Sequence, residues 1–430
     1  MKTVGLISLG CDKNRTDSEN ILFQLREAGF ALVPDVQNAD IVIVNTCAFI
    51  EAAKKESIDT ILEFVDTKRE GQTLVVVGCM AQRYGEELKK ELPEVDIIAG
   101  VNSYHKIAEI IAAKKALTIN AEYTPFTKGR VLTTPPHYSY LKISEGCNNN
   151  CTYCAIPKIR GKYRSEKFED LIKEAEGLVN DGVKEIMLVA EDITRYGEDI
   201  YGKNRLYELL KELVKLPVYK YRLMYAYPDN LPDNIIELIS SEEKIAKYVD
   251  IPLQHVSDSV LKRMNRKTGK ESITALLDKI RTINPEIAIR STFITGFPGE
   301  TEAEFNELHD FIKSARINYA GFFAYSQEEG TFAGEMPGQL PKSVRNKRQN
   351  VLSKAQSAVI VESQSKYLGQ TLPVIYEDID YKRNLFVGRT EFNAPNIDTL
   401  VYFSSKTPLD VGNIYDVKIT KTGFDLCGEN

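Results

Sequence analysis

Three cysteines fall within one short stretch of the chain, EGCNNNCTYCAIP, residues 145–157. Cys147, Cys151 and Cys154 have the spacing C-x3-C-x2-C, and the nearest histidine, His137, lies across an apolar run and a pair of prolines. Structural zinc is usually held by two ligand pairs, so this spacing argues against zinc. Three thiolates on a four-iron cluster leave one iron free to bind another ligand. The stretch therefore favours an iron–sulfur site with an open iron.

The sequence that surrounds this stretch predicts a parallel barrel that is open on one side. Six apolar runs alternate with helical patterns: YLKIS (140–144), EIMLVAED (185–192), YRLMYAY (221–227), YVDIPLQ (248–254), IRSTFITGF (289–297) and GFFAYS (321–326). Alternation of strand and helix is typical of a parallel sheet, and six such units make a partial (β/α)6 barrel. The three cysteines follow the first run, at the end of the strands where barrels place their active sites.

A second set of cysteines lies in the first ~115 residues, which also alternate strand and helix. Cys11, Cys47 and Cys79 each lie close to the carboxyl end of an expected strand. Ligands of open α/β sheets bind at these strand ends, so three thiols distant in sequence can meet at one site. The pattern fits buried hydrophobic cysteines, a zinc site or a cluster with an open iron. Thr16 and Glu19 have the spacing of a capping box at the start of the first helix.

These patterns divide the 430 residues into three domains, as expected for a chain too long for one core. A long polar helix at about 341–367 precedes short strand-like runs separated by turn residues, which indicate a small all-β domain. We expect an α/β protein with an N-terminal parallel α/β domain (1–117), a linker (118–138), the central barrel (139–365) and the all-β domain (366–430).

Composition and charge indicate a soluble protein of the cytoplasm. Hydrophobic residues make up 43% and charged residues 27% of the chain, and the net charge of −6 gives no general attraction to nucleic acid. The N-terminal run MKTVGLISLG is not followed by a signal cleavage site, and no run approaches the ~18 apolar residues of a membrane helix. In a reducing compartment, seven cysteines favour metal ligands or catalytic groups over disulfides. Cys427 is expected to be an idle thiol.

With an aromatic residue, Tyr153, before its third cysteine, the C-x3-C-x2-C stretch resembles the radical S-adenosylmethionine superfamily. The resemblance implies a [4Fe-4S] cluster on Cys147, Cys151 and Cys154, with S-adenosyl-L-methionine (SAM) bound at the open iron. It also implies an electron donor, which the sequence does not identify. No catalytic residue is assigned beyond the cluster ligands.

A three-cysteine α/β domain, a radical barrel and a small β domain, in this order, are similar to the methylthiotransferases. That family resemblance implies that Cys11, Cys47 and Cys79 bind a second, auxiliary [4Fe-4S] cluster. In the family, the open iron of this cluster holds the sulfur that is methylated and then attached to a substrate carbon.

Four further residues are expected to contact SAM by the same resemblance. Glu191, in AED (190–192), stands where the superfamily contacts the amino group of the cofactor, although the usual glycine-rich form is absent. Gln254 ends the fourth strand, and Gly296 and Gly299 belong to TGFPGET (295–301), which resembles a glycine-containing cofactor-binding stretch but also fits an ordinary loop. His255 fits a proton acceptor and a structural histidine equally.

Two branches of the family differ in substrate. One modifies an isopentenylated adenosine beside the anticodon of tRNA, and the other modifies the β-carbon of an aspartate in ribosomal protein S12. Stretches outside the cysteine motifs resemble the second branch: LGCDKNRTDSE (9–19), NTCAFIEAAKKESID (45–59), DITRYGEDIYG (192–202), YAYPDNL (225–231), PLQHVSDSVLKRMNR (252–266), AYSQEEGT (324–331) and GRTEFNAPNIDTLVY (388–402).

The C-terminal domain resembles a TRAM domain, a fold often used to hold RNA. Residues 364–430 contain seven Lys and Arg but nine Asp and Glu. RNA binding depends heavily on basic residues that neutralise phosphates, so this balance fits a basic ribosomal protein better than tRNA. We expect ribosomal protein S12 as the substrate, with contact to the ribosome through the C-terminal domain and with tRNA methylthiolation as the alternative.

Overall fold

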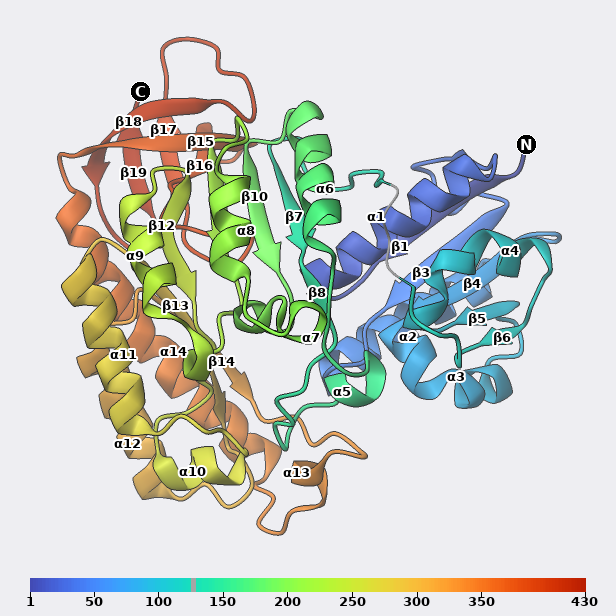
Figure 1. Cartoon of the computed structure of the whole chain (residues 1–430), viewed down its shortest axis with the longest axis horizontal. Helices are drawn as coiled ribbons and strands as arrows, with labels where there is room; N and C mark the ends of the chain where they lie inside the picture. Colours follow the sequence, from blue (N-terminus) through green and yellow to red (C-terminus); the bar gives the residue numbers. More distant parts are fainter. Residues whose placement is uncertain (125–128) are drawn as a thin grey trace.

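The N-terminal part of the chain folds into a six-stranded parallel sheet in the order β2-β1-β3-β4-β5-β6 (Figure 1). The computed structural model describes residues 1–124 and 129–430. The strands are β1 Thr3–Ser8, β2 Ala31–Leu32, β3 Ile41–Thr46, β4 Thr73–Gly78, β5 Ile97–Ala99 and β6 Leu117–Thr118. The strand order reverses between β1 and β3, and such a reversal opens a ligand-binding crevice at the carboxyl ends of the strands.

The helices of this domain follow its strands after short turns, and the cysteines lie at these turns. They are α1 Asp12–Glu27, α2 Glu51–Asp66, α3 Cys79–Glu91 and α4 Ile107–Ala112, with a 3-10 turn at Val101–Lys106 before α4. The capping box expected at Thr16 and Glu19 is wrong. The helix already begins at Asp12, so Thr16 donates to the Asp12 carbonyl within the first turn and Glu19 accepts from Arg130 instead.

The central sheet has the six parallel strands expected from the sequence, in the order β14-β13-β12-β11-β10-β7, and it is not closed. Its strands are β7 Tyr138–Lys142, β10 Glu185–Val189, β11 Lys220–Leu223, β12 Ile245–Asp250, β13 Ala288–Thr295 and β14 Tyr319–Ala324. A short hairpin, β8 Ser144–Glu145 with β9 Arg164–Ser165, frames the cysteine stretch after β7. The expectation of a partial (β/α)6 barrel is confirmed.

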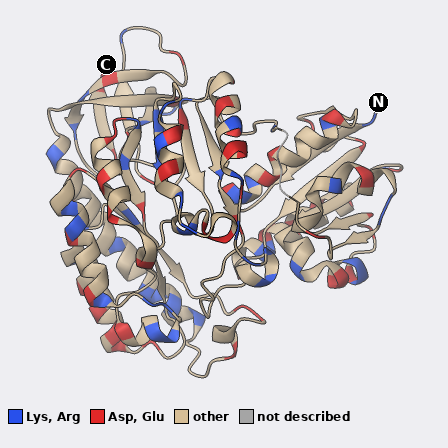
Figure 2. Cartoon of the chain, viewed as in Figure 1, with Lys and Arg blue, Asp and Glu red and all other residues tan. Residues whose placement is uncertain are grey.

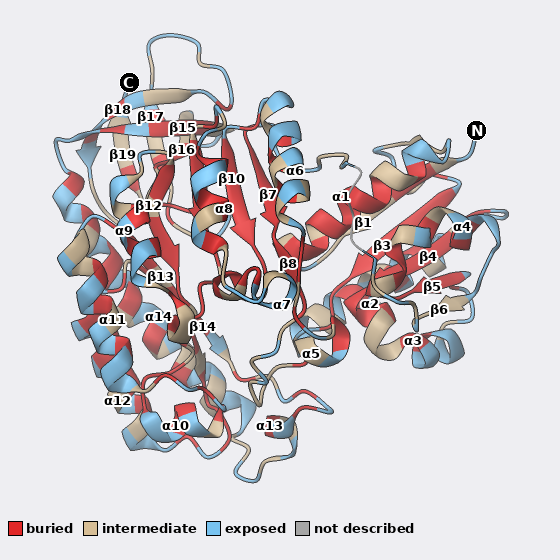
Figure 3. Ribbon diagram, viewed as in Figure 1, coloured by how far each residue is buried: buried red, intermediate tan, exposed pale blue. Residues whose placement is uncertain are grey.

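Amphipathic helices cover the outer face of the central sheet, with their apolar sides against the strands (Figure 3). The longer helices are α6 Phe168–Asn180, α8 Leu206–Leu213, α9 Asp233–Ser241, α11 Lys270–Ile283, α12 Glu302–Ala315 and α14 Lys342–Gln364. Short helices in the loops are α5 Ile156–Ile159, α7 Glu198–Tyr201, α10 Asp258–Arg263 and α13 Phe332–Glu335. Apolar packing therefore fixes the middle of each strand, and the carboxyl ends of the strands line the open end of the barrel.

The C-terminal residues form a small closed barrel, in the order β15-β16-β17-β19-β18. Its strands are β15 Thr371–Asp380, β16 Leu385–Arg389, β17 Val401–Ser404, β18 Ile414–Lys421 and β19 Leu426–Glu429. It lies against the amino ends of the central strands, where Arg389 bonds Glu185 (2.8 Å) and Tyr248 donates to Asp398 (2.8 Å). The barrel thus covers the end of the sheet opposite the cysteines.

The N-terminal domain spans the open side of the central sheet, because it contacts both edge strands or their loops. On one edge, α1 packs against β7. On the other, Lys54 and Arg83 bind Glu328, in the loop after β14, at 2.7 and 3.0 Å. Arg130 of the expected linker is buried against Glu19; linker residues 125–128 lie outside the described residues.

In the described part of the chain, no helix has the length and apolar character needed to cross a membrane.

Candidate functional site

The dispersed cysteines meet at the crevice of the N-terminal sheet. Cys11, Cys47 and Cys79 follow β1, β3 and β4, which are neighbours in that sheet. Gly10 lies so close to Cys47 that a Cβ on it would meet the Cys47 Cβ at 2.7 Å and its Sγ at 3.1 Å. Gly10 has a φ of +86°, which favours glycine, so this turn can bring Cys11 beside Cys47 without a steric clash.

Side chains of the same domain fix the turns that carry these thiols. Asn14 donates to the carbonyls of Leu9 (3.0 Å) and Thr46 (2.9 Å) and so ties the end of β1 to the end of β3. The Cys79 Sγ lies 3.7 Å from the Asn14 Oδ1. The Ser57 hydroxyl accepts from the Cys47 N–H (3.0 Å) and donates to its carbonyl (2.9 Å).

Burial disfavours the thiolate form of two of these cysteines. It raises the pKa of Cys79 to about 12, although nearby Arg160 opposes the shift. Burial and the neighbouring Cys11 also raise the pKa of Cys47. Thiolates are the metal-binding form of cysteine, so a bound metal has to displace these protons. Over residues 1–124 and 129–430, no three His, Cys, Asp or Glu side chains are placed to hold a single metal ion.

The clustered cysteines lie in the loop between β8 and α5. The Cys147 N–H donates to the Gly161 carbonyl (3.2 Å), which closes the base of the loop, and the Cys154 N–H donates to the Cys151 carbonyl (3.0 Å). The Arg266 guanidinium lies 3.9 Å from the Cys151 Sγ, so the loop holds its thiols beside a cation. Burial raises the pKa of Cys147 to about 12 and raises that of Cys154 as well.

The two sets of cysteines border one buried region, because α5 packs against α3 (Figure 1). Ala155 and Ile159 belong to the same apolar cluster as Cys79. Directly after α5, Arg160 bonds both oxygens of Glu145 (2.8 and 3.0 Å) and reaches across the domain boundary to Asp17 (3.0 Å).

Arg160 also donates to the Asn14 Oδ1 at 2.6 Å, and thereby joins the cysteine loop to the residue beside Cys79. Lys142 completes the buried group through Glu145 (2.8 Å) and Asp17. The sequence does not predict this group, although Glu145 stands inside the cysteine stretch. Lys142 and Arg160 lie more than 100 residues from Asp17, and no local spacing links them to it.

Glu191 is the expected SAM contact that the structure places between the two sets of cysteines. Its side chain is only 7% exposed, and neither carboxylate oxygen has a hydrogen-bond partner among the described residues. The Arg160 Nε lies 3.8 Å away. Burial and the nearby Glu145 raise the pKa of Glu191 to about 6. A buried carboxylate without a hydrogen bond is unfavourable unless a ligand supplies the donor.

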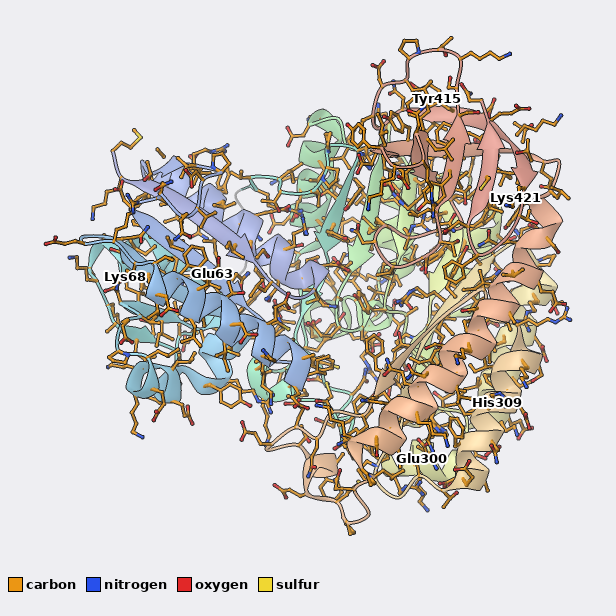
Figure 4. The ribbon with its side chains drawn as sticks, turned by 180° about the vertical axis from the view of Figure 1, so that it is seen from behind. Glu63, Lys68, Glu300, His309, Tyr415 and Lys421 are labelled. Carbon is orange, nitrogen blue, oxygen red and sulfur yellow. The ribbon has the colours of Figure 1, made fainter. Side chains whose placement is uncertain are left out.

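Gln254, Gly296 and Gly299, the other expected SAM contacts, lie on the far side of the barrel, in surroundings that differ from those of Glu191. Gln254 has a φ of +73°, an unusual conformation for a non-glycine residue. Gly296 and Gly299 also have positive φ, and a Cβ on Gly296 would meet Arg345 at 2.3 Å. The Gly296 N–H donates to Glu300 (2.8 Å), which Figure 4 labels beside α14, so within the loop this amide is already bonded.

His255 is fully buried beneath this loop. Its Nδ1 accepts from the Ser257 N–H (3.0 Å), and its Nε2 lies 3.7 Å from Glu300.

Cys427 lies on β19 of the C-terminal barrel, near the end of the chain. In the fold it is remote from both sets of cysteines (Figure 1).

The donor set fits the cofactors that the sequence implies. Three thiols lie in one loop beside a cation, and three more meet at a sheet crevice. Between them lies a buried carboxylate, Glu191, that accepts no hydrogen bond from the described residues. Both acidic and basic residues occur along the strands and loops of the C-terminal barrel (Figure 2).

Comparison with known families gives a match for each of the three domains. Residues 3–100 match the uncharacterized protein family UPF0004, residues 141–312 the radical SAM superfamily and residues 368–430 the TRAM domain.

Curated relatives match over the whole chain. The ribosomal protein uS12 methylthiotransferase RimO of Thermoanaerobacter sp. (strain X514) is 46% identical over 438 residues, covering 100% of both chains. The protein of the same name from Clostridioides difficile (strain 630) is 44% identical, covering 100% of this chain and 99% of its own.

Solved structures share the fold at low identity. The radical S-adenosylmethionine methyltransferase TsrM from Kitasatospora setae has a TM-score of 0.58 at 14% identity, covering 75% of each chain. The cobalamin-dependent S-adenosylmethionine radical enzyme OxsB has a TM-score of 0.53 at 14% identity, covering 82% of this chain and 56% of its own.

Proposed function

The chain belongs to the ribosomal protein uS12 methylthiotransferase RimO family, and from that premise we propose that it adds a methylthio group to the β-carbon of an aspartate in ribosomal protein uS12. It is a radical SAM enzyme and a transferase. The observation that carries the proposal is the pair of cysteine trios that border one buried region across a domain boundary. A reaction that combines a radical with a transferred sulfur group needs its two sources close to one substrate carbon.

SAM and a [4Fe-4S] cluster are the cofactors of the superfamily, and in the proposal Cys147, Cys151 and Cys154 hold this cluster. We assign a second [4Fe-4S] cluster to Cys11, Cys47 and Cys79. When bound, the clusters and SAM supply the organic radical and the methylated sulfur. Cys47 and Cys79 are buried and the three clustered cysteines are half-buried, which limits the access of water to them, whereas Cys11 is exposed.

The remaining site residues of the proposal position SAM. No described residue donates a hydrogen bond to the Glu191 carboxylate, which suits the ammonium group of SAM. Gln254, Gly296 and Gly299 lie at the carboxyl ends of β12 and β13 or in the loop beyond, at the same mouth as the cysteines. Arg266 contacts the Sγ of Cys151.

In this proposal, residues 1–117 carry the auxiliary cluster, 139–365 form the radical core and 366–430 form the TRAM domain. The TRAM domain provides the contact to the ribosome, and an external donor supplies the electron. The low net charge of residues 364–430 favours a protein partner over tRNA as substrate.

The test is an oxygen-free assay of protein with rebuilt clusters, SAM and a reductant, offered uS12 and unmodified tRNA in parallel. Mass spectrometry should find the methylthio group on an aspartate of uS12. A methylthio group on adenosine, with uS12 unchanged, would overturn the assignment of substrate while leaving the chemistry in place.

A further inference from the structure

Two lysines are buried at the junction of the N-terminal domain and the central sheet, and their surroundings differ. Lys142 binds two carboxylates, Glu145 at 2.8 Å and Asp17. Lys13 forms no ion pair with any carboxylate of residues 1–124 and 129–430, although it is only 7% exposed. Its ammonium makes one long hydrogen bond, 3.5 Å to the Ala190 carbonyl. An ammonium has three donors, so this buried cation has capacity for a further acceptor.

Tyr225 holds the Lys13 ammonium in place from one side. The Nζ lies 3.6 Å from the centre of the tyrosine ring, within the range of a cation–π contact. Tyr225 has a φ of +61°, which is strained for an aromatic residue, and its N–H donates to Asp250 (3.1 Å). Its hydroxyl donates to Asp12 (3.3 Å). Strain of this kind persists where the surrounding structure requires the side chain in one position.

The position of Lys13 links the two proposed cluster sites. It stands two residues after Cys11, while its hydrogen-bond acceptor, Ala190, directly precedes Glu191 in the central domain. A group bound by the Lys13 ammonium would therefore lie between the auxiliary site on one side and the SAM site on the other.

We infer that Lys13 binds the side-chain carboxylate of the aspartate that is modified, an inference that rests on the function proposed above. The carboxylate carbon of aspartate is bonded directly to the β-carbon. An ion pair at the carboxylate therefore fixes the carbon that reacts, at a point between both cofactors. The pair also selects the substrate. Asp12 and Glu191 lie near enough to attract the Lys13 ammonium but form no ion pair with it, so an asparagine in the same place would leave the cation without a direct carboxylate partner.

SAM also carries a carboxylate, so the test distinguishes binding of the substrate aspartate by Lys13 from binding of SAM. Protein with rebuilt clusters is titrated, without oxygen and with SAM present, with two fluorescent peptides that span the target site of uS12. One peptide has aspartate at that site and the other has asparagine. Anisotropy gives the affinity for each peptide, and a separate titration gives the affinity for SAM.

The unaltered protein should bind the aspartate peptide about 10–100-fold more tightly than the asparagine peptide. K13M removes the charge at similar length, and K13Q removes it while keeping a donor for Ala190. Both variants should bind the two peptides equally, at the weaker affinity, with the affinity for SAM unchanged. K13R should recover part of the preference, since the positive charge remains.

Preserved preference for aspartate in K13M or K13Q would overturn the inference, and so would a loss of SAM affinity with the preference intact. If K13M fails to fold, the affinities of K13Q and of the unaltered protein for the two peptides test the inference in the same way. A failure of the proposed function is distinct, because the unaltered protein would then modify neither peptide. Lys158→Met, which removes a lysine whose partner is the Gly330 carbonyl, is the matched control and should keep the preference.

Discussion

Replacing Arg160 by methionine should destabilise the protein by about 3 kcal/mol, because it removes one member of a buried charge group. The Arg160 side chain is 1% exposed, and it binds both oxygens of Glu145, Asp17 (3.0 Å) and Asn14 (2.6 Å). Breaking a buried ion pair by removing one partner costs about 3–5 kcal/mol. The lower end applies here, because Lys142 stays beside the same two carboxylates.

The assay is thermal unfolding followed by far-ultraviolet circular dichroism, since the chain contains no tryptophan for fluorescence. For domains of this size, a loss of about 3 kcal/mol lowers Tm by about 6–12 °C. Arg316→Met is the control: Arg316 binds Glu362 at 2.8 Å, but both side chains are more than half exposed. That pair should contribute less than about 1 kcal/mol.

A second variant tests the cause of the loss. Combining Arg160→Met with Glu145→Gln removes both charges of the pair, so the double variant should be less destabilised than the sum of the single variants by about 1–2 kcal/mol. A Tm for Arg160→Met within the range of the surface control would refute the reasoning. Strict additivity would show that the loss comes from packing and not from an unpaired charge.

Three further predictions concern the clusters, the domain contact and the SAM loop. Cys151→Ala should abolish SAM cleavage, whereas Cys47→Ala should retain uncoupled cleavage but lose methylthio transfer. Chromatography of the SAM products measures cleavage, and mass spectrometry of uS12 measures transfer. Undiminished transfer by Cys47→Ala would contradict the auxiliary site. Burial disfavours the charge of Glu185, but two buried arginines lower its pKa from 4.5 to about 2, so its contribution to stability is present above pH ~4.5 and is lost as the pH falls toward 2. Glu185→Gln should therefore lower Tm at pH 7 and flatten the acid limb of the Tm profile; an unchanged acid limb would refute the linkage. Gly296→Ala should lower Tm and SAM affinity, since the added Cβ meets a side chain at 2.3 Å. Gly29→Ala, where φ is also positive but nothing lies within 4 Å of the added Cβ, should lose only about 1 kcal/mol, and equal losses would show that the backbone conformation alone matters.

Local patterns in the sequence were sufficient to predict the fold. Continuous apolar runs such as 39–46 and 185–192 become buried parallel strands, because a strand covered on both faces needs apolar side chains throughout. The cysteines could be placed at strand ends for the same reason, since strand–helix turns follow each run directly. The capping-box prediction at Thr16 and Glu19 failed because Glu19 has a tertiary partner, Arg130. A spacing rule carries no information about a partner more than 100 residues away.

The sequence alone determined the two cysteine trios, the parallel strands that carry them and the small β domain, because each of these depends on spacing and periodicity within a short segment. Only the tertiary structure decided that both trios border one region and that Arg160, Lys142 and their carboxylates join the domains there. It alone distinguishes Lys13, which has no carboxylate ion pair within residues 1–124 and 129–430, from Lys142, which has two. Whether a buried charge is paired depends on side chains brought together by packing across domains, and that packing is not encoded in any local pattern.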